Sequence, residues 1–86
     1  MTKKQVYEEL EKSWNIFKMI NKDIYNVYKQ DSVLDRPKIT MKDEFIAEKI
    51  FLIERVLERI VKRGDISRDL SYEIYNEILE SWNGGR

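Results

Sequence analysis

The sequence predicts an all-α protein, a compact three-helix bundle in a single domain that spans residues 1–86. Three observations predict it. Apolar residues recur at helical spacing over three long stretches, capping and stop residues bound these stretches, and only one substantial linker interrupts them. The chain is 42% apolar and 37% charged, a balance typical of a small helical domain with a core.

The first helix is expected over residues 3 to about 30. Thr2 and Gln5 have the spacing of a capping box, in which each side chain bonds the free backbone N–H of the other residue. The segment "NKD" at residues 21–23 is a weak point, where this helix can kink or break. Asn21 falls within the apolar stripe, and we expect it to bond a backbone group or another polar side chain. The stripe contains Val6, Leu10, Phe17, Ile20, Ile24 and Val27.

Residues 31–39 form the expected linker, because Pro37 disfavours a helical conformation for the residue before it. A second helix is expected over residues 41–63. Thr40 begins it, and Gly64 ends it, because glycine adopts the left-handed conformation of a helix stop without steric cost.

A third helix is expected over residues 67–82. Either Asp65 or Ser67 caps its first turn. The remaining residues, 83–86, read as a flexible tail.

The second helix has an apolar face that is wider than one neighbouring helix needs. On a helical wheel the apolar residues fill an arc of about 180°, which suits a helix packed between two others. They are Phe45, Ile46, Ile50, Leu52, Ile53, Val56, Leu57, Ile60 and Val61. Glu9 and Lys49 lie near the edges of the apolar stripes, and we expect both side chains to extend to water. Three wide stripes with short connections predict that each helix packs on the other two.

A few apolar residues remain outside these stripes. Phe51 points into the charged face of the second helix, between Glu54 and Arg55. Met19 lies on the polar side of the first helix, and Tyr72 lies at the edge of the third stripe. Scattered exposed apolar residues are normal, but a large aromatic residue ringed by charges is typical of a binding hot spot. We therefore predict contact with another protein or a second copy of the chain, with a homodimer or larger assembly favoured over a monomer.

Charges are segregated on the helices. The third helix carries an acidic stripe, Asp69, Glu73, Glu77 and Glu80. The first helix carries a basic side, Lys4, Lys18, Lys22 and Lys29. Each stripe is either a solvated face or one half of a complementary contact. In the second interpretation the acidic stripe binds a basic surface, on another protein or on the first helix of a second copy.

The sequence offers little catalytic chemistry. It contains no histidine, no cysteine and no glycine-rich phosphate loop, so we expect no catalytic residues, no cofactor and no metal site. A formal net charge of zero makes nucleic acid an unfavourable partner. The longest unbroken apolar run, residues 50–53, is far too short to cross a bilayer, and no signal peptide is recognisable, so we expect a cytoplasmic protein.

The residues thus favour a non-enzymatic module that occupies a partner protein, as small regulators, immunity proteins and phage-type or other mobile-element inhibitors do. Its expected contact residues are Phe51, Met19, Tyr72, Asp69, Glu73, Glu77 and Glu80. The alternative is a DNA-binding accessory protein. Residues 58–78 superficially resemble a helix-turn-helix, but the carboxylates of the third helix would repel phosphates. DNA would then contact the lysine side of the first helix, at Lys18, Lys22 and Lys29.

Overall fold

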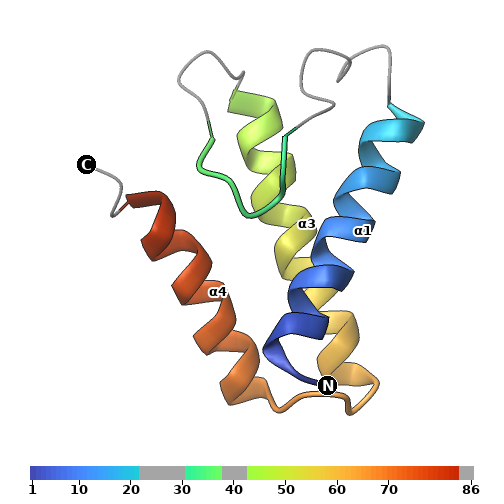
Figure 1. Ribbon diagram of the computed structural model, residues 1–86, viewed down its shortest axis with the longest axis vertical. Helices are drawn as coiled ribbons and strands as arrows, with labels where there is room; N and C mark the ends of the chain where they lie inside the picture. The colour runs from blue at the N-terminus through green and yellow to red at the C-terminus, as the bar shows by residue number, and fades with distance from the viewer. Residues whose placement is uncertain (22–30, 38–42, 84–86) are drawn as a thin grey trace.

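The protein is a three-helix bundle, as predicted (Figure 1). The computed structural model describes residues 1–21, 31–37 and 43–83. Its helices are α1 (Lys3–Ile20), α3 (Asp43–Lys62) and α4 (Arg68–Asn83), and the described residues form no strand. The middle helix, α3, packs against both α1 and α4.

The start of α1 confirms the predicted capping box. The Thr2 hydroxyl accepts a hydrogen bond from the Gln5 backbone N–H at 3.2 Å, and the Gln5 side chain accepts one from the Thr2 N–H at 2.8 Å. The helix ends at Ile20, at the predicted weak point. Asn21 is its C-cap, and its side chain donates to the Phe17 carbonyl at 2.9 Å, as expected. Residues 22–30 of the predicted first helix lie outside the described part.

The end of α3 confirms the predicted role of Gly64, which has a φ of 78°. The Gly64 N–H donates to the Val61 carbonyl at 2.9 Å, and the Asp65 N–H donates to the Ile60 carbonyl at 3.2 Å. This pair of bonds is a Schellman motif, which satisfies the last carbonyls of the helix. The expected cap of the second helix, Thr40, lies outside the described residues.

Ser67, rather than Asp65, caps α4. The Ser67 hydroxyl accepts a hydrogen bond from the Leu70 backbone N–H at 3.1 Å. The Asp65 carboxylate instead pairs with the Arg63 side chain at 3.0 Å. α4 begins at Arg68, and the helix extends to Asn83.

The core forms around α3. Five of the nine residues of its predicted apolar face are buried, whereas Ile46, Ile50, Leu52 and Val61 are half-buried. The buried apolar residues are Val6, Leu10, Trp14, Val33, Phe45, Ile53, Val56, Leu57, Ile60, Ile66, Ile74, Ile78 and Trp82. α1 and α4 do not pack closely on each other, in contrast to the expectation. The segment 31–37 crosses α3 in the space between them (Figure 1). Val33 of this segment is fully buried, and the Trp82 indole donates to the Leu34 carbonyl at 2.9 Å.

The prediction that Lys49 extends to water is wrong. Its side chain is fully buried, forms an ion pair with Asp31 at 2.9 Å and donates to the Asp35 carbonyl at 2.7 Å. The Nζ atom also lies 5.9 Å from the ring centroid of Trp14 and 5.6 Å from that of Trp82. The segment 31–37 covers this part of α3 and supplies the acceptors, so the lysine is paired inside the fold.

Lys18 is also buried, so its assignment to an exposed basic side of α1 is wrong. Its ammonium group donates to the backbone carbonyl of Asp31 and lies 5.8 Å from the Trp14 ring centroid. Burial lowers the pKa of Lys18 from its usual 10.5. The loss of hydration is the largest cause, and it outweighs the nearby Asp31 carboxylate, which acts in the opposite direction.

Candidate partner-binding surface

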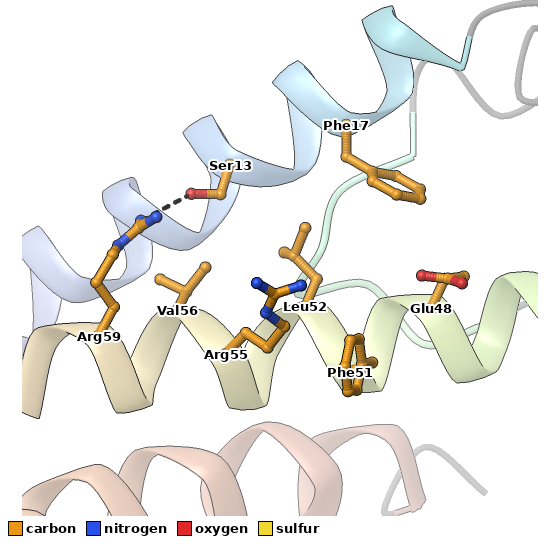
Figure 2. Close-up of a pocket in the computed structure, with 8 residues that line it drawn as sticks. All are labelled: Ser13, Phe17, Glu48, Phe51, Leu52, Arg55, Val56 and Arg59. Atoms are coloured by element: carbon orange, nitrogen blue, oxygen red, sulfur yellow. Dashed lines mark hydrogen bonds between the residues drawn. The ribbon is translucent and has the colours of Figure 1, made fainter.

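A groove runs between α1 and α3. Its lining residues are Ser13, Phe17, Glu48, Phe51, Leu52, Arg55, Val56 and Arg59 (Figure 2). α3 supplies six of these side chains, from the part of its surface that α1 leaves uncovered. The volume of about 290 Å³ is slightly below the range of about 300–1,000 Å³ that is usual for small-molecule sites. Its lining combines two phenylalanine rings with one glutamate and two arginines.

The groove has an aromatic centre and charged ends. Figure 2 shows Arg59 at one end, Glu48 at the other, and Phe51 and Arg55 between them. Arg59 donates to the Ser13 hydroxyl at 3.4 Å, which links the two walls. The Arg55 guanidinium lies 5.5 Å from the Phe51 ring centroid, within the range of a cation–π contact.

Phe51 is exposed, as the sequence predicts, with 53% of its surface accessible. Its role in binding stays a prediction. The sequence placed Phe17 in the core stripe, whereas it is half-buried and contributes to the groove wall, stacked on Trp14 at 5.6 Å between ring centroids. Helical periodicity alone assigned Phe17 to the apolar side. Periodicity could not show that α3 leaves one edge of the Phe17 ring exposed.

Met19 and Tyr72 are exposed as well, but the structure does not bring them to the groove. Met19 borders a shallow hollow on α1 that includes Ile16. Tyr72 lines a separate hollow between α3 and α4. The structure also exposes Ile16, and it exposes Ile20, which was expected in the apolar stripe of the first helix. The three predicted apolar contact residues thus lie in three different places.

The acidic stripe on α4 is exposed at all four positions, Asp69, Glu73, Glu77 and Glu80. Its centre is already paired within the chain. Lys3 of α1 donates to Glu77 at 2.8 Å and to Glu73 at 3.5 Å, and the Tyr7 hydroxyl donates to Glu77 at 3.1 Å. The hydrogen bond from Lys3 lowers the pKa of Glu77, and the bond from Tyr7 acts in the same direction.

The acidic stripe therefore already contacts a basic side chain of the same protein, Lys3 of α1. The hydrogen bond to Glu77 raises the pKa of Lys3, while burial is the main cause that raises the pKa of Tyr7. Asp69 and Glu80, at the two ends of the stripe, form no ion pair within the described residues. These two carboxylates are the part of the stripe that is most available to another molecule.

Among the described residues, no group of three or more acidic, histidine or cysteine side chains is placed to hold a metal ion. None of the helices in the described ranges is long and apolar enough to cross a membrane. Comparison with family models, curated proteins and solved structures finds no match to this chain. Interpretation of its function therefore depends on the surface alone.

Proposed function

We propose that this chain is a small non-enzymatic protein-binding module that acts by occupying a partner protein, in the manner of a regulator, an immunity protein or a phage-type inhibitor. The partner is another protein or a second copy of the chain, met in the cytoplasm. The observation that carries the proposal is the exposed Phe51 ring, set in a groove between two helices and flanked by Arg55.

This arrangement has the properties of a binding hot spot. Aromatic and arginine side chains dominate such sites, where they become fully desolvated only when the partner arrives. Phe51 stands on α3, whose opposite side is packed into the core at Ile53 and Ile60. A side chain on a rigid element loses little conformational entropy on binding, so more of its contact energy contributes to affinity.

The polar groups of the groove suit recognition better than catalysis. Arg55 and Arg59 offer hydrogen-bond donors and no acceptor, so they suit the binding of carboxylates and carbonyls. The Ser13 hydroxyl is bonded to Arg59 rather than to a base that would activate it. Glu48 lies at the far end of the groove from Ser13 (Figure 2).

The DNA-binding alternative loses one of its three lysines. Lys18 is buried and directed to the Asp31 carbonyl, so it is not available to a phosphate. Lys22 and Lys29 lie outside the described residues. No observation favours this function over protein binding, and we do not propose it.

The test is a comparison of the proteins enriched from cell extract by immobilised wild type, Phe51→Ser and Ile20→Ser, with quantitative mass spectrometry. Ile20 is the matched control, because it is a large exposed apolar residue outside the groove and is not one of the expected contact residues. A hot-spot residue contributes about 2 kcal/mol or more, which corresponds to a loss of affinity of roughly 30-fold.

We expect at least one bound protein, the chain itself included, to be retained by wild type and Ile20→Ser and lost from Phe51→Ser. The proposal fails if folded Phe51→Ser retains every protein that the wild type binds.

A further inference from the structure

The exposed face of α3 has a graded charge. Its N-terminal half is acidic, with Glu44 and Glu48, and its C-terminal half is basic, with Arg55 and Arg59. Phe51 lies between the two halves. All five side chains are exposed, and successive members are three or four residues apart, so they follow one side of the helix.

Two other carboxylates on this helix already have partners within the chain. Glu54 accepts a hydrogen bond from the Tyr75 hydroxyl at 2.9 Å, and Glu58 pairs with Arg68 at 3.2 Å. In contrast, Glu44 and Glu48 form no ion pair among the described residues. Arg55 lies over the Phe51 ring and pairs with no carboxylate there.

Arg59 is held by two long contacts within the chain, an ion pair with Glu9 and a hydrogen bond of 3.4 Å to the Ser13 hydroxyl. Its distance to Glu9 is 3.7 Å, at the outer limit of an ion pair, and both side chains are substantially exposed. The charges that remain available are therefore acidic at one end of the α3 face and basic at the other.

Two copies related by a two-fold axis would have complementary charges along α3. When two copies meet through α3 with the helices antiparallel, the acidic half of each faces the basic half of the other. In one register Glu48 faces Arg55 of the second copy and Glu44 faces Arg59. Two-fold symmetry repeats each pair, so four opposite-charge pairs form. A parallel arrangement would instead place like charges together, which is unfavourable.

The centre of the same register is apolar. In that register Phe51 would lie next to the two-fold axis and face Leu52 of the second copy, with the second copy's Phe51 beside it. Ala47, one turn before Phe51, is exposed and is the only alanine in the chain. Its small side chain leaves room beside the ring, and the distance between packed helices depends on the side chains at the contact.

The molecule is broad enough for such a contact. Its extents are 35 × 32 × 19 Å, and α1, α3 and α4 lie side by side on the face where Phe51 and Arg55 stand (Figure 2). A standard interface buries about 800 Å² on each partner. The two larger extents, 35 and 32 Å, bound a face large enough to supply that area.

We propose that the groove beside Phe51 binds a second copy of this chain, through an antiparallel α3–α3 contact in which Glu48 pairs with Arg55 across a two-fold axis. This inference rests on the proposed function, because it names the occupant of the same surface.

The test is sedimentation equilibrium of purified protein from micromolar to millimolar concentration, on wild type, Glu48→Arg and Arg55→Glu. Each variant places like charges together at two symmetric positions, so we expect the dimer dissociation constant to rise by at least about tenfold. In an equimolar mixture of the two variants, one chain carries arginine at both positions and the other carries glutamate at both, so opposite charges face each other again. We therefore expect the mixture to form a heterodimer, although each variant alone does not associate.

This restoration by mixing requires contact between the two positions on different chains. An effect on the folding of one chain would not produce it, and thermal melts of each variant check that the fold is kept. A wild type that is monomeric over the whole range overturns the inference, and so does a dimer that both charge reversals leave unchanged. If the wild type is monomeric yet loses an extract protein on Phe51→Ser, the self-contact is wrong and the proposed function stands. If Phe51→Ser changes neither self-association nor extract binding, both are wrong.

Discussion

Replacement of Lys49 by methionine tests the buried ion pair that joins the segment 31–37 to α3. The Asp31 carboxylate is 3% exposed, and the Lys49 ammonium is its one ion-pair partner among the described residues. Methionine keeps most of the apolar volume of the lysine stem but removes the charge. The variant leaves the Asp31 carboxylate buried beside Lys18, which is directed to the Asp31 backbone carbonyl.

The expected loss is large relative to the stability of so small a domain. Removal of one member of a buried ion pair costs about 3–5 kcal/mol, because the remaining charge stays desolvated. The Asp35 carbonyl also loses a hydrogen bond of 2.7 Å, which adds about 1 kcal/mol. A stability of about 0.05–0.15 kcal/mol per residue predicts roughly 4–13 kcal/mol for the chain. Lys49→Met should therefore remove a third or more of it.

Urea unfolding followed by tryptophan fluorescence measures this loss directly. Trp14 and Trp82, the two tryptophans of the chain, both lie beside the Lys49 ammonium, so the probe reports on the altered site. Lys12→Met is the matched control, because Lys12 is exposed and should change stability by less than about 0.5 kcal/mol.

The double variant Lys49→Met with Asp31→Asn removes the stranded charge as well. We expect it to recover about 1–3 kcal/mol of the loss. Two results would refute this explanation: a Lys49→Met variant whose free energy of unfolding lies within about 1 kcal/mol of that of wild type, or a double variant that is no more stable than Lys49→Met.

Three further predictions follow from burial and backbone geometry. Phe51→Ser should change the free energy of unfolding by less than about 0.5 kcal/mol, because Phe51 is exposed. Ile53 is fully buried, so Ile53→Ser should lower that free energy by about 3 kcal/mol or more. Equal melting temperatures of the two variants would show that Phe51 belongs to the core. Because burial lowers the pKa of Lys18, the unfolded chain binds more protons than the folded chain between the folded pKa and 10.5, so stability should rise with pH in that window. Lys18→Met should lack this rise of stability with pH. Urea titrations of wild type and Lys18→Met at several pH values test this, and the same pH dependence in both proteins would contradict the prediction. Gly64→Ala should lower the free energy of unfolding by about 1 kcal/mol, because φ at this position is 78°, a conformation that strains any residue with a Cβ. No atom lies within 4 Å of the added Cβ, so backbone strain is the sole cause of this loss. An unchanged urea midpoint would exclude that strain.

The parts of the fold that sequence could predict are those set by neighbouring residues. The capping box of α1 and the stop at Gly64 depend on side chains and dihedral angles within one turn, so they are readable without knowledge of the rest of the chain. The exposure of Phe51 was predictable for the same reason, since its charged neighbours lie one turn away on the same helix. The groove beside it was not predictable, because Phe17 and Phe51 come together only when α1 packs on α3.

The burial of Lys49 could not be predicted from neighbouring residues, and it helps to determine which side of α3 is exposed. Its partner, Asp31, lies in a non-helical segment whose path across α3 depends on burial of Val33 and on the bond from Trp82. No helical wheel contains that information. Lys49 and Phe51 are two residues apart, which places them about 200° apart around the helix, on opposite sides. An ion pair and a carbonyl bond hold the Lys49 side, so they fix the rotation of α3 about its own axis. The same contacts that bury one unexpected lysine therefore determine that Phe51, with Glu48 and Arg55 beside it, is presented to solvent.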